Sequence, residues 1–306
     1  MRVFRGYHRP VPAPTVLAIG NFDGVHLGHG ALVRRLVQAA RQHAVAPTVL
    51  TFEPHPREFF SPASAPARLT TLREKLELLN ECGAEQAMVC RFDAAFAALS
   101  AEQFVEEVLV RGLQVRHVII GDDFRFGKGR RGDLDLLRVE GEKRGFGVEA
   151  MDSVIVDGER VSSSGVRKAL AVGDMERAAR LLGRPYVIDG RVVHGDKIGR
   201  QIGFSTANIR IKHNPLPMTG VFAVEVGGLG DQPLPAVANL GIRPTVNGTR
   251  PLLEVHIFDF DRDIYGSHLS VRFVHKLRDE QKFPSFDALK AQIALDAQAA
   301  RAYFKR

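Results

Sequence analysis

The stretch Gly20-Asn21-Phe22-Asp23-Gly24-Val25-His26-Leu27-Gly28-His29 separates an apolar run from an amphipathic pattern. Residues 16–19, which precede it, are apolar and β-prone, and the run is too short for a helix. After it, apolar side chains recur at helical spacing from Leu32 to Ala40, with arginines between them. The segment therefore predicts a strand, a glycine-rich turn and a helix, the repeating unit of parallel α/β sheets.

The composition of this turn suits a phosphate group. Gly20 and Gly24 permit a tight turn and a close approach of the backbone to a ligand. Unpaired N–H groups at a helix start favour an anion, and His26 and His29, three residues apart, fall on one face. A plain turn with two surface histidines is the alternative. The order of strand, two glycines and H-x-G-H resembles the nucleotidyltransferase signature, which implies ATP binding and attack at its α-phosphate.

The composition is that of a water-soluble globular protein. A length of 306 residues favours two domains, and 45% hydrophobic and 25% charged residues are ordinary values. No apolar run reaches the roughly 20 residues of a membrane span, and the N-terminus lacks the apolar core of a signal peptide. The two cysteines, Cys82 and Cys90, have no metal-ligand spacing and predict no disulfide framework. We therefore expect a cytoplasmic protein.

The formal net charge of +7 indicates anionic partners. Basic residues are scattered, apart from the run at 128–131, and no zinc finger or RNA-binding aromatic motif is present. Phosphorylated small molecules are the simpler explanation, so we expect no nucleic acid and no membrane as partners. A monomer or a weak homo-oligomer is expected. The sequence contains no G-x-x-x-x-G-K-[ST] loop, which excludes an ordinary P-loop NTPase.

The first half of the chain alternates between strand-like and helix-like segments. The predicted strands are 16–19, 48–52, 86–92, 115–120 and 148–151, and the predicted helices include 68–79 and 100–110, the latter opened by a Ser100/Gln103 capping box. Such alternation predicts a doubly wound parallel sheet. Ligands of these sheets bind beyond the carboxyl ends of the strands, where the segments 20–29, 53–56 and 121–127 all lie.

Three consecutive serines, 162–164, precede a predicted helix that carries Arg167. Hydroxyls at this place are ordinarily helix caps. Together with a guanidinium, the same hydroxyls can bind the β- and γ-phosphates of a nucleotide as pyrophosphate leaves. Both interpretations stay open. Asp174 then caps a helix through Leu182, and we place the domain boundary after residue 183.

The second half of the chain has the residue pattern of strands rather than helices. Segments 187–193, 221–226, 252–258 and 269–274 are strand-like and are joined by glycine- or proline-containing connections. This pattern favours a small antiparallel β-barrel, followed by a C-terminal helix capped by Ser285 and running to Phe304. The predicted domains are therefore 1–183, an α/β domain, and 184–306, a barrel with a terminal helix.

One strand of the predicted barrel carries a candidate catalytic carboxylate. Glu254 and His256 share a face, opposite that of the apolar Leu253 and Val255. If that face is open to solvent, Glu254 is a surface carboxylate. If it lines the barrel mouth, Glu254 is a candidate general base for a hydroxyl group.

Taken together, these stretches resemble the bifunctional bacterial riboflavin kinase/FAD synthetase family. The matching segments are 20–29, 51–56, 121–127 and 162–167 in the first domain and 195–208, 220–224, 239–245 and 277–283 in the second. The resemblance implies that the second domain phosphorylates riboflavin with ATP to give FMN. It also implies that the first domain transfers the adenylyl group of a second ATP to FMN, giving FAD and pyrophosphate.

The resemblance also implies residue roles. Glu254 takes the ribityl proton, and Thr206 and Asn208, in the loop that contains Gly199, hold Mg²⁺ and the ATP phosphates. ATP handling in adenylylation falls to Gly20, Asn21, Phe22, His26, His29, Arg160, Ser163, Ser164 and Arg167. The flavin-binding candidates are Phe59, Phe60, Asp123 and Arg278. FMN already carries an anionic phosphate, so its adenylylation needs charge neutralisation and alignment rather than a base.

Three positions depart from the family pattern. Ser205 replaces a proline and its fixed φ, Ser164 replaces a threonine, and Asp123 stands where some relatives carry asparagine. Because of Ser205, one alternative is a chain that retains adenylylation only. Another is a basic flavin- or nucleic-acid-binding protein without catalysis, which predicts binding without pyrophosphate release.

Overall fold

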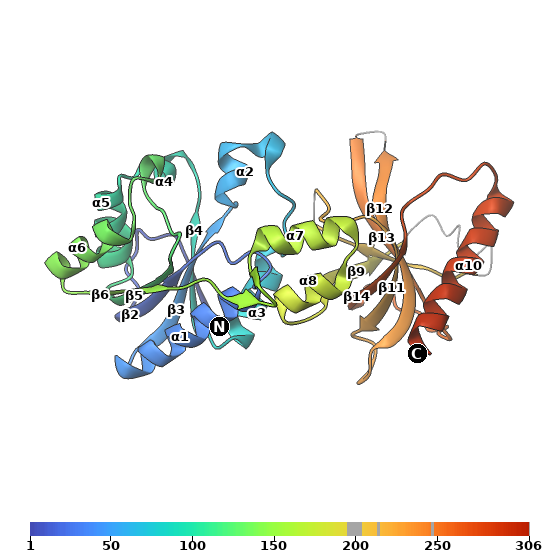
Figure 1. The fold of residues 1–306 in the computed structure, drawn as a ribbon, viewed down its shortest axis with the longest axis horizontal. Helices are drawn as coiled ribbons and strands as arrows, with labels where there is room; N and C mark the ends of the chain where they lie inside the picture. Colours follow the sequence, from blue (N-terminus) through green and yellow to red (C-terminus); the bar gives the residue numbers. More distant parts are fainter. Residues whose placement is uncertain (195–203, 213–214, 246–247, 306) are drawn as a thin grey trace. The chain divides into compact units, whose positions relative to one another are not determined.

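The computed structural model describes residues 1–194, 204–212, 215–245 and 248–305. The chain forms two compact units (Figure 1). The first unit comprises residues 1–66 and 72–162, and the second comprises 67–71 and 163–306. In the part of the chain that is described, no helix combines the length and apolar character needed to span a membrane. The domain boundary after residue 183 stays a prediction.

The first unit contains a parallel sheet of six strands in the order β1-β4-β3-β2-β5-β6. Its strands are β1 (Arg2–Arg5), β2 (Thr15–Ile19), β3 (Ala46–Glu53), β4 (Gln86–Arg91), β5 (Val115–Gly121) and β6 (Gly147–Met151). A separate hairpin pairs β7 (Ile155–Val156) with β8 (Glu159–Arg160). The predicted doubly wound sheet is confirmed, with β1 as an additional edge strand that the sequence did not indicate.

Helices cover both faces of this sheet (Figure 1). The helices of this unit are α1 (Leu27–Gln42), α2 (Pro56–Phe60), η1 (Pro62–Ser64), α3 (Leu72–Glu81), α4 (Ala94–Ala98), α5 (Ala101–Gln103), the π-helix η2 (Phe104–Gly112), η3 (Lys128–Arg130) and α6 (Leu134–Arg144). On β2, Val16 and Ala18 share a core with α1 and α3, whereas Leu17 and Ile19 share one with η2 and α6. Both faces of β2 are therefore buried, as its uninterrupted apolar sequence requires.

The helix predicted from Arg68 begins later, at Leu72. Residues 67–71 belong to the second unit, where the carbonyl of Ala67 accepts a hydrogen bond of 2.6 Å from Nε of Arg167. Leu69 is fully buried. These contacts hold the segment in a non-helical conformation, which overrides its local helical pattern.

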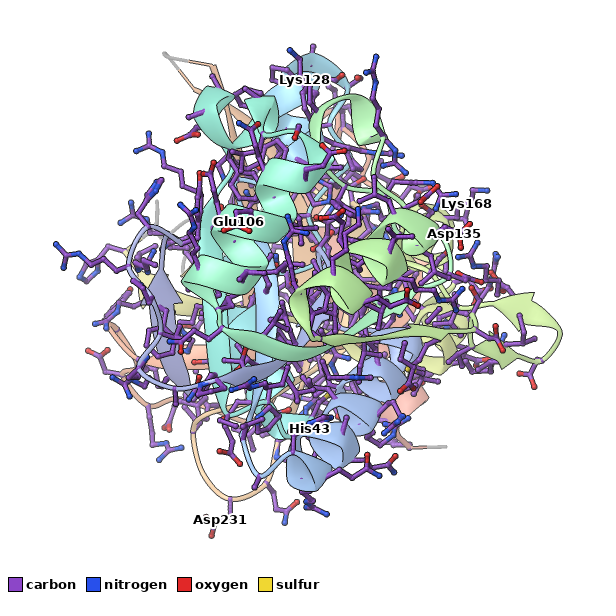
Figure 2. The ribbon with its side chains drawn as sticks, turned by 90° about the vertical axis from the view of Figure 1, so that its left-hand side faces the viewer. His43, Glu106, Lys128, Asp135, Lys168 and Asp231 are labelled. Atoms are coloured by element: carbon purple, nitrogen blue, oxygen red, sulfur yellow. The ribbon has the colours of Figure 1, made fainter. Side chains whose placement is uncertain are left out.

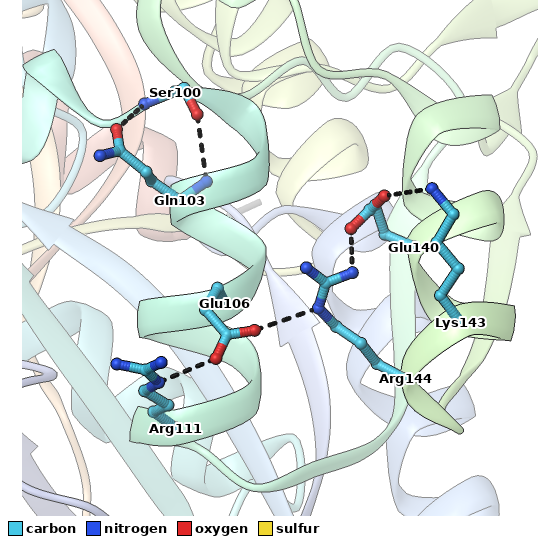
Figure 3. A network of polar contacts seen from close by, with 7 residues as sticks. All are labelled: Ser100, Gln103, Glu106, Arg111, Glu140, Lys143 and Arg144. Atoms are coloured by element: carbon cyan, nitrogen blue, oxygen red, sulfur yellow. Dashed lines mark hydrogen bonds and ion pairs between the residues drawn. The ribbon is translucent and has the colours of Figure 1, made fainter.

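The predicted capping box is present, but the helix that it opens becomes a π-helix. Polar contacts join this π-helix, η2, to α6 (Figure 3). Glu106 accepts hydrogen bonds of 2.8 Å from Arg111 and 3.2 Å from Arg144, and Arg144 also pairs with Glu140. The residues drawn are Ser100, Gln103, Glu106, Arg111, Glu140, Lys143 and Arg144. The network fixes η2 against α6 on one side of the sheet.

The second unit begins with two helices and continues as a closed barrel. The helices are α7 (Ser163–Val172) and α8 (Met175–Leu182), the latter capped by Asp174 as predicted. The barrel runs β10-β13-β12-β11-β14-β9 around its circumference, with antiparallel neighbours. Its strands are β9 (Tyr186–Val193), β10 (Ala207–Arg210), β11 (Gly220–Gly227), β12 (Leu234–Thr245), β13 (Gly248–Ile257) and β14 (His268–Arg278).

Alternating residues of the barrel strands pack inward and outward. Phe222 and Phe273 meet edge to face inside, with ring centroids 5.2 Å apart. The outer side of β11 contributes Val221 and Ala223 to a core shared with α10 (Phe286–Phe304). The Ser285 hydroxyl accepts a hydrogen bond from the Ala288 N–H, so the predicted barrel and its capped C-terminal helix are both confirmed.

Candidate active sites

The glycine-rich turn lies at the carboxyl end of β2 in an unusual backbone conformation. Phe22 and Val25 have left-handed φ values of 50° and 40°, and Gly24 has a φ of 82°. The Phe22 ring is fully buried, and a Cβ on Gly20 would lie only 3.2 Å from its Cζ. Left-handed backbone at non-glycine residues is strained and is concentrated at ligand sites.

The two histidines of this turn lie together at the start of α1. His26 is the N-cap residue, and its Nδ1 accepts a hydrogen bond of 3.3 Å from the His29 N–H. The imidazole rings stack, with centroids 3.7 Å apart and planes 15° apart. Because Nδ1 of His26 is an acceptor, the proton of its neutral ring is on Nε2. The turn thus offers an imidazole N–H beside the N–H groups of a helix start.

His29 is electrostatically different from a surface histidine. Its Nδ1 atom is buried and has no hydrogen-bond partner among the described residues. Burial lowers the pKa of His29 well below its ordinary value, and the charges of His26 and Lys75 lower it further. His29 is therefore neutral at physiological pH and can donate one hydrogen bond without adding a full positive charge.

The end of β5 supplies acidic groups to the same edge of the sheet. The guanidinium of Arg160 pairs with Asp123 at 2.8 Å and lies 3.6 Å from Asp122, and all three side chains are exposed. Asp122 also accepts a hydrogen bond of 3.3 Å from the Ser153 hydroxyl. The structure thus brings Arg160 and Asp123 together, while their contacts with ATP and flavin stay predictions. Lys128, which follows the same strand, lies at the opposite end of the unit from His43 (Figure 2).

Aromatic side chains gather on α2. Phe59, Phe60 and Phe92 contact one another with centroid distances of 5.2–5.6 Å, and Phe60 is 64% exposed. The His55 side chain caps this short helix, which directly follows β3. Exposed aromatic rings at a carboxyl edge suit a planar apolar ligand.

The remaining predicted ATP residues of the first domain lie on α7, in the second unit. Ser163 is its first residue, Ser164 follows, and Arg167 lies one turn later. The Arg167 Nε is engaged by the carbonyl of Ala67, as described above. The phosphate-binding roles of these three residues stay predictions.

In the barrel, Glu254 lies between two amides. It is paired across the strands with Asn208 on β10 and with Asn239 on β12. Leu253 and Val255 are fully buried on the opposite face, which confirms the alternation expected from the sequence. Glu254 therefore lies on the outer side of the barrel wall rather than at the barrel mouth. On that side, α10 and the adjoining loop enclose a cavity.

This cavity, of about 290 Å³, is bounded by the barrel wall and α10. Its apolar lining includes Leu252, Leu289 and Ile293, and Glu254 lies in its wall. Arg278 also lines it, held by two hydrogen bonds of 2.8 and 2.7 Å to Asp296 of α10. A mainly apolar cavity with a few converging polar groups is typical of a binding site for an organic ligand.

A second cavity, of about 160 Å³, adjoins the first. Thr206 lines both cavities, and Asn208 lines the second together with Asp261 and Asp263. The preceding carbonyl, that of Ser205, accepts a hydrogen bond of 2.8 Å from His256 Nδ1. This bond restrains the loop at the position where the family pattern has a proline. Gly199 lies outside the described residues.

Three residues at the large cavity were not predicted from the sequence as site residues. Asn239 and Asp296 line the large cavity, and His256 both lines it and restrains the Ser205 loop. Asp296 could have been found from the sequence, because it is a charged residue on the otherwise apolar face of the C-terminal helix, with Ile293 and Ala300. Asn239 lies on a strand that was not predicted, so its pairing with Glu254 could not be inferred.

Comparisons with known proteins give a consistent result. A family model described as FAD synthetase matches residues 8–165, and one described as riboflavin kinase matches residues 182–304. The chain is 50% identical over 307 residues to the bifunctional riboflavin kinase/FMN adenylyltransferase of Escherichia coli (strain K12), covering 99% of this chain and 98% of that protein. Identity to the protein of the same name from Haemophilus influenzae is 47%, covering 99% of each chain.

A solved structure agrees in fold over nearly the whole length. It is described as a macrolide-efflux protein from Streptococcus pneumoniae and is 29% identical, with a TM-score of 0.83 and coverage of 98% of this chain and 99% of that chain. The two family models follow one another along the chain in the same order as the parallel sheet and the barrel. The chain therefore belongs to the bifunctional riboflavin kinase/FMN adenylyltransferase family.

Proposed function

We propose that the chain makes FAD from riboflavin in two ATP-dependent steps, the kinase step in domain 184–306 and adenylylation in domain 1–183. The observation that carries the proposal is the position of Glu254 between a mainly apolar cavity and the amide of Asn208, with Thr206 lining both neighbouring cavities. This arrangement provides a cavity for an aromatic substrate beside a carboxylate base. The phosphate ligand Asn208 lies on the neighbouring strand, one strand spacing from the base.

In the kinase step, the flavin ring occupies the larger cavity and its ribityl chain extends towards Glu254. A primary alcohol is a weak nucleophile at neutral pH, so a positioned carboxylate that accepts its proton speeds attack on the γ-phosphorus of ATP. The oxygen–phosphorus bond of FMN forms as the bond to ADP breaks. His256 keeps the Ser205 carbonyl, and with it the start of the phosphate-binding segment, in place.

The residues around the second cavity fit a magnesium ion. Thr206 and Asn208 offer oxygen atoms, the donor type that Mg²⁺ prefers, and the carboxylates of Asp261 and Asp263 line the same cavity. When bound, Mg²⁺ neutralises phosphate charge. Thr206 and Asn208 would hold it against ATP, and Glu254 would accept the proton.

In the adenylylation step, the FMN phosphate attacks the α-phosphorus of ATP and pyrophosphate leaves. The nucleophile is already anionic, so the residues align the reactants and stabilise charge. The Nε2–H of His26 and the first N–H groups of α1 donate to phosphate oxygens, and neutral His29 supplies a further donor. Ser163, Ser164 and Arg167 are additional phosphate ligands, as the family resemblance implies.

Phe59 and Phe60 are the aromatic surface that we assign to the flavin ring in this step. Gly20, Asn21 and Phe22 bring the backbone close to the nucleotide, and Arg160 and Asp123 lie beside it on the same sheet edge. We also place the enzyme in the cytoplasm, where the thiols of Cys82 and Cys90, which form no disulfide, remain reduced.

The test is product analysis. The protein is incubated with riboflavin and ATP, with and without Mg²⁺, and flavins and pyrophosphate are separated and quantified. We expect FMN to accumulate first and FAD with pyrophosphate to follow. If FAD forms only from supplied FMN, the kinase assignment is wrong; if flavin binds without release of ADP or pyrophosphate, the catalytic assignment fails altogether.

A further inference from the structure

A buried lysine that none of the roles above uses lies behind the nucleotide-binding turn. Lys75, in the first turns of α3, is only 4% exposed. Burying an ammonium group is unfavourable unless hydrogen bonds or charges compensate for its lost hydration. The contacts of the Lys75 side chain indicate why it is buried.

The ammonium group of Lys75 is connected to the turn by the hydroxyl of Thr51. Its Nζ lies 3.4 Å from Oγ1 of Thr51, and this Oγ1 donates a hydrogen bond of 3.2 Å to the carbonyl of Asn21. Thr51 is fully buried near the end of β3, so water cannot take over either contact. A hydroxyl that accepts from one group and donates to another is fixed in orientation at both ends.

The turn that receives this contact needs such support. Phe22, the residue after Asn21, has a left-handed φ of 50°, a strained conformation that persists only when its surroundings determine it. The Phe22 ring in turn meets the His29 ring edge to face, with centroids 5.2 Å apart. A shift of the Asn21 carbonyl would therefore move the Phe22 ring and the imidazole that packs on it.

We propose that Lys75 is a positioning residue for adenylyl transfer, acting through Thr51 to fix the Asn21 carbonyl and with it the conformation of the nucleotide-binding turn. The proposal rests on the proposed adenylylation of FMN. The influence of the Lys75 charge on His29, described above, agrees with the closeness of the two side chains. Lys75 and Thr51 thus add a supporting layer behind the phosphate-handling turn, and Lys75 lies outside the segments that match the family pattern.

The experiment removes the Thr51 hydroxyl while the size of the side chain stays nearly the same. Thr51→Val deletes the relay, Thr51→Ser retains the hydroxyl, and Lys75→Met deletes the ammonium. Thr48→Val is the matched control, because Thr48 is also fully buried on β3 but donates its hydroxyl to the Ala46 carbonyl, away from the turn. For each variant, kcat and KM for ATP in FAD formation from FMN are measured, with riboflavin phosphorylation by the same preparation as the internal control of folding.

We expect Thr51→Val to lower kcat/KM for ATP in adenylylation about 10-fold, the effect of losing one hydrogen bond to a charged group. Thr51→Ser and Thr48→Val remain near the wild-type value, and riboflavin phosphorylation is unchanged in all variants. The double variant Lys75→Met/Thr51→Val is no worse than Lys75→Met alone, because both substitutions break the same relay.

Two results would overturn the proposal. One is equal adenylylation by Thr51→Val and Thr48→Val. The other is losses from Lys75→Met and Thr51→Val that multiply in the double variant, which would mean that the two residues act separately. A wild-type protein that makes no FAD from FMN would instead refute the proposed function, so the two failures are distinguishable.

Discussion

Glu254 on β13 and Asn208 on β10 are direct partners across two antiparallel strands, so their side chains project from the same face of the barrel. Neighbouring strands lie about 4.8 Å apart. The roles proposed for Glu254 and Asn208, a base on one strand and a phosphate ligand on the next, therefore have the spacing that transfer of a phosphoryl group to a hydroxyl requires. The barrel achieves this with residues 46 positions apart in the chain, from Asn208 to Glu254.

Replacing the carboxylate should abolish only the kinase reaction. We expect Glu254→Gln to lower the rate of FMN formation by at least about 100-fold, because an amide cannot accept the ribityl proton. FAD formation from supplied FMN should be unaffected. The control is Glu225→Gln, in the barrel but outside the cavity lining, where Glu225 pairs with Arg272. Equal loss of both activities in Glu254→Gln would contradict the separation of the two sites.

Replacing the second histidine of the turn should have the opposite selectivity. We expect His29→Asn to reduce adenylylation of FMN about 100-fold, as removal of a preorganised donor to a developing charge does. Riboflavin phosphorylation should persist. His43→Asn, at the other end of α1 and of the sheet (Figure 2), is the matched control and should retain both activities. An unchanged rate of FAD synthesis in His29→Asn would remove this imidazole from the site.

The sequence revealed the parts of the fold whose local pattern and tertiary role agree. The strand, turn and helix around residues 16–42 and the Ser285 cap followed from apolar spacing and capping chemistry. Strand β12 was missed because Pro235, Gly241 and Pro244 resemble turn residues, although the barrel accommodates them. The edge strand β1 is short, lacks apolar alternation and is largely exposed.

The candidate sites were predictable to a similar extent. The face occupied by Glu254 followed from the two-residue period of a strand. That the face lines a cavity did not follow, because the packing of α10 on the outer barrel wall is a tertiary contact without local signal. The burial of Lys75 could not be predicted for the same reason, because a lysine in an amphipathic helix is ordinarily expected to be exposed to solvent.

Two histidines whose pKa is lowered should make the first unit sensitive to acid. Burial lowers the pKa of both His29 and His117, so the folded state favours their neutral forms. Their unfolded pKa values are about 6.5, so the unfolded state binds more protons below that pH. Stability is therefore full above about pH 6.5 and falls as pH drops towards the folded pKa values.

The measurement is thermal unfolding at a series of pH values for the wild type and for His29→Asn/His117→Gln. We expect the unfolding midpoint of the wild type to fall on acidification below about pH 6.5, and the double variant to show a shallower fall. Identical pH dependence in the two proteins would show that these histidines do not carry the effect.

The ion pair between Arg278 of β14 and Asp296 of α10 should maintain the shape of the cavity that we assign to the flavin. Arg278→Lys keeps the charge but loses the two-pronged contact with Asp296. We expect a several-fold rise in KM for riboflavin and a loss of about 1.5–3 kcal/mol in the free energy of unfolding. Arg272→Lys, on the same strand with a longer 3.9 Å contact to Glu225, should change neither. Steady-state kinetics and denaturant unfolding check both values.

The most direct test of the central claim, that two separate sites act in succession, is complementation between inactive variants. Glu254→Gln and His29→Asn are each incubated with riboflavin, ATP and Mg²⁺, alone and mixed, and flavins are quantified by chromatography. We predict that neither variant alone converts riboflavin to FAD, and that the mixture does, through FMN released by His29→Asn. A mixture that accumulates no FAD, although each variant retains its own remaining activity, would contradict two independent sites.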